Sequence, residues 1–131
     1  MEGKNKITSF KDLVAWSEWH KLVLSIYKIT EAFPKSEAFG LTMQLRRAIV
    51  SVTSNIAEGF SRVSSKDKAY CYIIALGSLT EVQNQIEIAR DVSFIVEVVY
   101  AELYKQTIII HKLINGLIKS TKNCAYEDKA I

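Results

Sequence analysis

Proline, the residue that interrupts helices most strongly, occurs only once in this chain of 131 residues, at Pro34. Glycine occurs only five times. Turn-rich β proteins need many more residues of these two kinds, so their scarcity favours long helices. Hydrophobic residues make up 49% of the chain and charged residues 24%, a composition typical of a globular protein. The length suits one domain with one core.

Apolar residues recur three and four positions apart in four segments, which is the spacing of amphipathic helices. This spacing predicts helices at about 10–32, 41–62, 66–90 and 95–121. Connections this short force neighbouring helices, each roughly 33–40 Å long, to run antiparallel. The predicted fold is therefore all-α, an antiparallel up-down-up-down four-helix bundle. It forms a single domain over residues 1–131, with flexible tails at 1–8 and 122–131.

Residues at the expected helix ends support these boundaries. The residue before a proline disfavours the helical conformation, so Phe33 and Pro34 end the first helix. In the connection that follows Pro34, the side chain of Phe39 is expected to tuck under the chain. Serines are expected to cap three of the helices: Ser9 (in a capping box with Asp12), Ser64 or Ser65, and Ser93.

The third and fourth helices carry distinct apolar seams. In the fourth helix the seam follows the pattern of a helix bundle: Val99, Leu103, Gln106, Ile110, Leu113 and Leu117. In the third helix one seam contains Tyr72, Leu76, Leu79, Gln83 and Ile86, and a second contains Ala75, Val82 and Ala89. A face this wide indicates contact with two neighbouring helices or with a second subunit.

The stretch Gly40–Gly59 combines apolar, cationic and hydrogen-bonding side chains more densely than any other. On a helix its core stripe contains Leu41, Leu45, Ala48, Ile49, Val52 and Ile56. Met43, Val50 and Ala57 form a thinner apolar stripe roughly opposite, which indicates either a partner or scattered surface residues. Gly59 lies on the core stripe, so a neighbouring helix is expected to approach closely there.

Basic side chains near this stretch are candidates for contact with nucleic acid: Arg46, Arg47, Arg62, Lys66 and Lys68. Arg46 borders the core stripe, so it could extend along the surface, pair with a carboxylate or bind phosphate. Arg47 lies on a polar stripe and could form a structural ion pair or contact a polyanion. The loop Ser61–Lys68 suits phosphate, although it could equally be a solvated turn.

Residues on the thinner stripe and on neighbouring polar and apolar positions are candidates for an oligomer interface: Met43, Val50, Ala57, Asn55, Glu58, Ala75 and Val82. Asn55 could read a base edge, but a buried asparagine more often sets the register between helices. Glu58 and Arg62 are four residues apart, a favourable spacing for an ion pair. Glu58 and Glu81 are interpreted as partners of arginines rather than as a catalytic pair.

Several classes of function are not expected. The longest run without charge, Ala69–Thr80, is too short to span a membrane, and no apolar signal segment begins the chain, so a cytoplasmic protein is predicted. The cysteines and histidines match no metal-ligand spacing: Cys71, Cys124, His20 and His111. No inward-facing Glu-x-x-His pair is present. We therefore expect no enzyme, metal or cofactor.

Three segments of the chain read FKDLVAWSEWHKLVLSIYKIT, FPKSEAFGLTMQLRRAIVSVTSNIAEGF and YIIALGSLTEVQNQIEIAR. They resemble the bacterial four-helix bundle proteins of the intervening-sequence family, which are encoded within insertions in large-subunit ribosomal RNA genes. The resemblance covers about residues 10–120, and GL-x-x-QLRRA-x-x-S-x-x-SNIAEG is its most specific part. It implies a compact four-helix bundle that assembles as a ring-like homopentamer. This chain has Thr53 where family members often have proline, which should make the second helix straighter.

The family is also similar to the accessory protein of diversity-generating retroelements, a pentameric barrel that binds a reverse transcriptase and nucleic acid. That protein is strongly basic, whereas this chain has 17 basic and 14 acidic residues and a net charge of +3. Two hypotheses follow. The protein is either an oligomeric adaptor that binds structured RNA or DNA, with or without a protein partner, or a protein-binding or structural module without a nucleic-acid role.

Overall fold

The computed structural model describes the backbone of residues 6–130 and the side chains of residues 6–123. Within this part of the chain it contains helices and no strand, which confirms the predicted all-α class. Four helices are long: α1 (Val14–Thr30), α2 (Leu41–Ser61), α3 (Ser65–Asp91) and α4 (Glu97–Ala130). Two are single 3-10 turns: η1 (Phe10–Asp12) and η2 (Lys35–Glu37).

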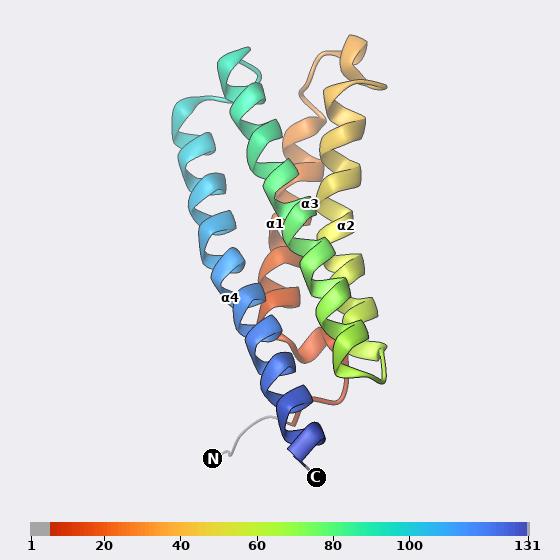
Figure 1. The fold of residues 1–131 in the computed structure, drawn as a ribbon. Coiled ribbons are helices and arrows are strands. Elements are labelled where there is room, and N and C mark those ends of the chain that lie inside the picture. The colour runs from red at the N-terminus through yellow and green to blue at the C-terminus, as the bar shows by residue number, and fades with distance from the viewer. Residues whose placement is uncertain (1–5, 131) are drawn as a thin grey trace.

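The four long helices lie side by side around one core (Figure 1). The chain passes along α1 from one end of the molecule to the other, returns along α2, and repeats this course with α3 and α4 (Figure 1). Each helix packs against the next, and α1 also contacts α4, which closes the arrangement. The beginning of α1 and the end of α4 therefore lie at the same end of the molecule (Figure 1).

The first helix begins four residues later than the sequence predicts. Ser9 and Asp12 do form the expected capping box, but it opens η1 rather than α1. The backbone of Leu13 is extended (φ −73°, ψ 128°), which turns its side chain into the core before α1 begins at Val14. Backbone N–H groups of Thr8 and Ser9 donate to the Asp12 carboxylate and lower its pKa.

The α3–α4 turn also differs from the prediction. Ser64 caps α3 as expected, since its hydroxyl accepts from the N–H of Asp67. Ser93 does not cap α4; it ends α3 in a left-handed conformation (φ 68°). The Ser93 N–H donates to Arg90 and the Phe94 N–H to Ala89, the pattern of a Schellman motif.

The fourth helix is longer and rotated relative to the prediction. It begins at Glu97 rather than near 95 and continues to Ala130, well past the predicted end at 121, because no glycine or proline follows Gly116 to stop it. Residues 1–5 and 131 of the predicted tails lie outside the described residues. The buried seam of α4 consists of Leu103, Thr107, Ile110, Ile114, Ile118 and Thr121.

Four of the residues assigned to that seam from sequence are instead half-buried: Val99, Gln106, Leu113 and Leu117. The error arises because α4 has adjacent isoleucines and leucines that satisfy two helical registers equally well. Contacts with α1 and α3 select the register, and a polar pair helps to hold it. Gln83 Nε2 of α3 donates to the hydroxyl of the fully buried Thr107 at 3.0 Å.

The core itself is aliphatic around one indole. Its largest fully buried side chains come from all four helices: Trp19, Leu22, Ile26, Leu45, Ile49, Ile56, Leu79, Ile86 and Ile114. The predicted close approach at Gly59 is confirmed, because a Cβ atom there would lie 2.6 Å from Tyr72 Cε1. This contact lets α2 and α3 converge near the turn that joins them.

Candidate interaction surfaces on α2 and α3

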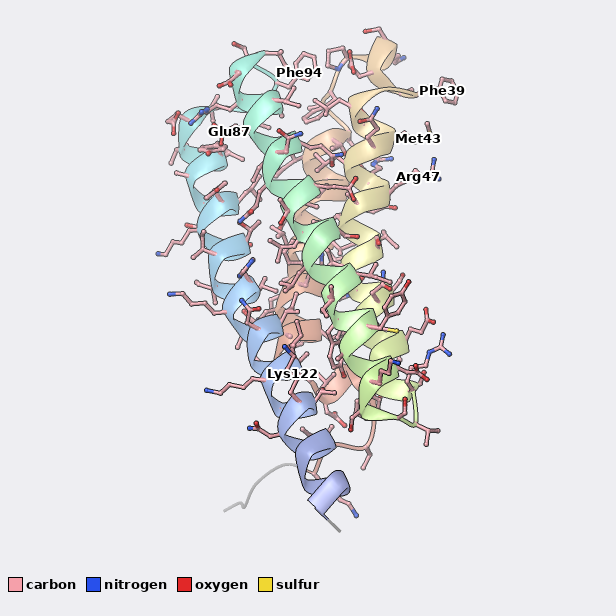
Figure 2. The ribbon with its side chains drawn as sticks, in the orientation of Figure 1. Phe39, Met43, Arg47, Glu87, Phe94 and Lys122 are labelled. Atoms are coloured by element: carbon pink, nitrogen blue, oxygen red, sulfur yellow. The ribbon has the colours of Figure 1, made fainter. Side chains whose placement is uncertain are left out.

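The outer face of α2 exposes apolar side chains. Met43 and Val50 are 36% and 37% exposed, and Ala57 is half-buried. Phe39, predicted to tuck under its connection, is instead 87% exposed. The short turn η2 and the irregular backbone of Gly40 (φ −110°, ψ −118°) carry Phe39 away from the core, and its ring projects from the same side as Met43 and Arg47 (Figure 2).

An open groove of about 470 Å³ runs beside this stripe, between α1 and α2. It is lined by Tyr27, Ala38, Thr42, Met43, Arg46, Arg47, Val50 and Ser51. A second open groove, of about 480 Å³, lies between α2 and α3 and is lined by Gln44, Arg47, Ala48, Ser51, Glu81 and Gln85. Arg47 lines both grooves, so α2 presents one ridge that contains Arg47 with a hollow on either side.

The second groove contains an unsatisfied polar group that the sequence did not reveal. Gln85 is only 7% exposed, and its side-chain oxygen accepts no hydrogen bond from any residue whose side chain is described. An unpaired buried acceptor costs about 1–3 kcal/mol. The sequence could not reveal this group, because the burial of Gln85 depends on how closely α2 packs there.

A small polar network links α2 and α3 at the same level. Asn55 Nδ2 donates to the Ser51 carbonyl at 2.8 Å and contacts the Ser51 hydroxyl at 3.2 Å. The hydroxyls of Ser51 and Ser78 share a hydrogen bond of 2.7 Å. The amide of Asn55 therefore bonds within the chain, and its network sets the register of α2 against α3.

Arg46 is held within the molecule. Its Nε donates to the Thr30 hydroxyl at 2.8 Å and its Nη2 to the Tyr27 carbonyl at 3.2 Å. The guanidinium also lies over the Tyr27 ring, 4.7 Å from the centroid. Arg46 therefore donates hydrogen bonds at the carboxyl end of α1, where carbonyl groups lack helical partners. Pairing with a carboxylate, one of the roles considered from the sequence, is not what the structure shows for the described residues.

Lys68 and Arg62 are held in a similar way near the turn between α2 and α3. Lys68 Nζ donates to the carbonyls of Gly59 and Phe60, at 3.3 and 2.6 Å, at the carboxyl end of α2. Arg62 forms an ion pair with Glu58, and this hydrogen bond raises the pKa of its guanidinium. The ion pair predicted from the four-residue spacing of Glu58 and Arg62 is therefore confirmed.

Arg47 and Lys66 are the two predicted cations that remain exposed without an ion pair to any described residue. The five predicted cations do not form one patch. Arg62, just beyond the end of α2, follows Arg47 by fifteen positions, which is about 22 Å along the helix. Arg46 and Arg47 lie toward one end of α2, whereas Arg62, Lys66 and Lys68 gather around the opposite end.

Two predicted interface residues are core residues. Ala75 and Val82 are both 0% exposed in this single chain. Helix α3 packs against α2 on one side and α4 on the other, so both of its apolar seams are covered within the molecule. The width of the α3 face reflects two neighbouring helices of the same chain, which was one of the two explanations open from sequence.

The described residues contain no group of three histidine, cysteine, aspartate or glutamate side chains that could hold a metal ion. Cys71 is buried with a free thiol, and the side chain of Cys124 lies outside the described part. None of the helices, over their described residues, is both long and apolar enough to cross a membrane. The hollows on α2 are open and shallow, which suits contact with a macromolecule.

Four long helices with open grooves on one face define a helical-bundle protein whose candidate site is a surface. Residues 11–116 match the family model of the 23S rRNA-intervening sequence protein. The chain therefore belongs to the 23S rRNA-intervening sequence protein family, as its sequence resemblance implies.

One solved structure with the same fold is a crystal structure of a protein of unknown function from the S23 ribosomal protein family of Bacteroides thetaiotaomicron. It is 23% identical, with a TM-score of 0.75, and the match covers 83% of this chain and 98% of that chain. No curated protein matches the sequence.

Proposed function

We propose that this chain is an antiparallel up-down-up-down four-helix bundle that assembles into a cytoplasmic homo-oligomer and associates with structured RNA or DNA without catalysing a reaction. The family is named for intervening sequences of 23S rRNA, which supports RNA as the partner. The number of five subunits, and the similarity to the retroelement accessory protein, rest on the family resemblance alone and stay predictions.

The proposed self-association rests on the outer face of α2. Phe39, Met43 and Val50 are exposed there beside the cation of Arg47. Covering apolar surface contributes about 25 cal/mol per Å². A second copy of the chain that packs on this face would cover the apolar stripe. Aromatic residues, methionine and arginine are also the residue types enriched in protein interfaces.

The unpaired oxygen of Gln85 supports the same surface. Gln85 lines a groove that is open to the outside, together with Arg47 and Glu81. A donor from a second copy that entered this groove would remove the cost of leaving that acceptor unpaired. Self-association would therefore satisfy both an apolar stripe and a buried polar group with one contact.

Association with nucleic acid rests on cations that the fold leaves available. Arg47 and Lys66 are exposed and have no carboxylate partner among the described residues. In a ring each of these side chains is repeated once per subunit, so a modest charge becomes a band of positive charge. Serine hydroxyls in the loop after α2 could add contacts to phosphate.

Light scattering tests the assembly. The wild-type protein is expected to scatter as a multiple of its 14.8 kDa subunit mass. The double variant Met43→Glu, Val50→Glu should shift toward the monomer, because it places two charges on the proposed interface. Val98→Glu is the control, since Val98 is 75% exposed on α4. A monomeric wild-type protein would contradict the proposal.

Fluorescence anisotropy tests the association with nucleic acid. Labelled fragments of 23S rRNA are titrated with the protein at two salt concentrations. Electrostatic binding weakens steeply as salt rises. Absence of binding at low salt, or binding that does not respond to salt, would refute the electrostatic association.

The second candidate function is a protein-binding or structural module without a nucleic-acid role. Two observations favour it: the near-balanced charge of +3, and the engagement of Arg46, Arg62 and Lys68 in contacts within the chain. The two candidates differ in one result. The module would form the oligomer seen by light scattering and would leave the anisotropy of every RNA fragment unchanged.

A further inference from the structure

The outward face of α4 carries a row of lysines. Lys105, Lys112 and Lys119 are seven residues apart and Lys122 follows one turn later. Seven residues make almost two turns of an α-helix, so these four side chains point to one side. All four are exposed, whereas the opposite side of this segment is the buried seam that contains Ile110, Ile114 and Ile118.

The row accounts for the positive charge of the protein. Residues 103–123 contain four of the 17 basic residues and none of the 14 acidic residues. The rest of the chain therefore has 13 basic and 14 acidic residues and is close to neutral. Although the net charge is only +3, the charge is unevenly distributed, because the excess of basic residues is concentrated on one helix face.

No carboxylate offsets these ammonium groups among the residues whose side chains are described. The nearest acidic side chain before the row, Glu102, accepts a hydrogen bond from Gln106. On the neighbouring helix α1, Glu18 is paired with Lys21 at 2.8 Å. Other long cations of this protein do have such partners, as the Arg62–Glu58 and Arg90–Glu87 pairs show.

The position of the row leaves it free if α2 is the assembly face. Helix α4 packs against α1 and α3, and in the described part of the chain its backbone makes no close approach to that of α2. Lys122 lies on α4, toward the opposite end of the molecule from Phe39, Met43 and Arg47 (Figure 2). A copy bound to α2 would therefore not cover the lysines of α4.

The dimensions suit a nucleic-acid helix. From Lys105 to Lys122 the row extends over 17 residue steps, which is about 25 Å along α4. A double helix has one phosphate charge per about 1.7 Å of its axis, so this length of duplex carries about 15 phosphates on its two strands, and the row meets those on one side. Each lysine would find a phosphate within reach of its flexible side chain.

We propose that the lysine row of α4 (Lys105, Lys112, Lys119 and Lys122) binds the phosphate backbone of a nucleic-acid helix. This inference rests on the proposed association with nucleic acid and moves its main contact from α2 to α4. It divides the surface into two parts. The α2 face joins copies of the chain, and the α4 face of each copy presents its lysines to the polyanion.

The contact is one of charge and shape rather than of base sequence. A lysine ammonium is a point charge that binds phosphate groups, whereas recognition of base edges requires side chains placed in a groove. The neighbouring Asn115 is already bonded to His111, at 3.0 Å. The row therefore predicts affinity for double-helical RNA of any sequence, with a strong dependence on salt.

The test compares two charge-matched variants of the full chain. In the first, all four lysines of the row are changed to glutamine: Lys105→Gln, Lys112→Gln, Lys119→Gln and Lys122→Gln. In the second, four exposed lysines near α1 are changed in the same way: Lys11→Gln, Lys21→Gln, Lys28→Gln and Lys35→Gln. Both variants lose the same charge. Circular dichroism and light scattering confirm that each retains its fold and assembly.

Binding is measured by anisotropy with a labelled RNA duplex of about 20 base pairs, long enough to span the row. The α4 variant is expected to bind at least about 100-fold more weakly at 0.1 M salt, and its log–log salt slope should shrink by about 3 to 4. The α1 variant should stay within about threefold of the wild-type protein, because only Lys21 and Lys28 of its four lysines share a helix face and Lys21 is already paired with Glu18. Equal losses in both variants would overturn the proposal.

A third variant, Arg47→Gln with Lys66→Gln, separates failure of this inference from failure of the proposed function. Loss of binding in that variant, with the α4 variant unaffected, would overturn the inference and leave the nucleic-acid association standing. A wild-type protein that binds no RNA would refute both.

Vesicles of phosphatidylserine and phosphatidylcholine are the last probe, because Ile108 and Ile109 beside the row are 41% and 49% exposed. Lysine-dependent binding to vesicles and not to RNA would also overturn the inference.

Discussion

The indole Nε1 of Trp19 donates a hydrogen bond to the carbonyl oxygen of Ile49 at 2.8 Å, and both residues are fully buried. This carbonyl lies in the middle of α2, where a regular α-helix also directs the N–H of Thr53 toward it. The bond fastens α1 to α2 at the centre of the core. It also explains how a buried tryptophan satisfies its only polar group.

Replacing Trp19 with phenylalanine should lower the free energy of unfolding by about 2 kcal/mol or more, because it removes both the hydrogen bond and buried volume. Denaturation by urea measures the change. Trp16→Phe is the control, since Trp16 is half-buried and stacks on His20. It should cost clearly less. Equal losses for the two variants would show that the contact with Ile49 contributes little.

Proline at position 53 should be tolerated better than proline elsewhere in α2. A proline in a helix interior costs about 3 kcal/mol or more, in part because the carbonyl four residues earlier loses its donor. For Thr53→Pro that carbonyl belongs to Ile49 and keeps its bond from Trp19. We expect a cost about 1 kcal/mol smaller than for Val50→Pro, measured by thermal and urea unfolding. The reverse order would refute this explanation.

Two glycines should respond to alanine with opposite signs. At Gly59 a Cβ atom would lie 2.6 Å from the Tyr72 ring, so Gly59→Ala should destabilise the protein by about 1–3 kcal/mol. At Gly77, also within a helix, no neighbouring atom lies within 4 Å of the added Cβ. Gly77→Ala should therefore stabilise it by roughly 0.5–1 kcal/mol. Differential scanning calorimetry would resolve both shifts.

Ser93→Gly should stabilise the α3–α4 turn. Ser93 adopts φ 68° at the position of a Schellman motif that glycine fills most often. Relief of this left-handed strain is expected to raise the free energy of unfolding by about 1 kcal/mol. Ser93→Ala, which keeps the Cβ atom and removes only the hydroxyl, is the matched control and should not stabilise. A stabilising alanine would contradict the backbone argument.

Tyr100 should titrate well above an ordinary tyrosine. Its hydroxyl donates to the carboxylate of Glu87, which, together with desolvation, raises the pKa of Tyr100 to about 12. The unfolded chain releases this proton near pH 10, so the stability from the bond is present below that pH and is lost as pH rises from about 10 to 12.

An absorbance titration of phenolate checks this prediction, with Tyr100→Phe as the reference. The difference between the two proteins should titrate near pH 12. Between pH 10 and 12 the wild-type protein should lose more stability than the variant. A difference spectrum that titrates near pH 10 would contradict the bond to Glu87.

The sequence by itself determined the class of fold, because helical periodicity and the scarcity of proline and glycine are local properties. It also predicted the close approach at Gly59 and a serine cap at 64 or 65, since each depends on a residue type at a helix position; the structure selects Ser64. The second apolar stripe of α2 was visible in the same way, from the spacing of Met43 and Val50.

Only the tertiary structure decided which of several compatible roles each side chain takes. Helix α4 has two apolar registers, and packing against α1 and α3 chose the one with Ile114 and Ile118 inside. The same packing buried Ala75 and Val82, which the sequence placed equally well at an interface between subunits.

The tertiary structure also decided which cations form hydrogen bonds within the chain. Arg46 and Lys68 bond to carbonyl groups at helix ends that come near them only in the folded chain. The lysines of α4, in contrast, are exposed, and the fold brings no carboxylate to them among the described side chains. Periodicity sorts residues onto faces, but which face meets another surface, and which charge finds a partner, depends on contacts between segments distant in the sequence.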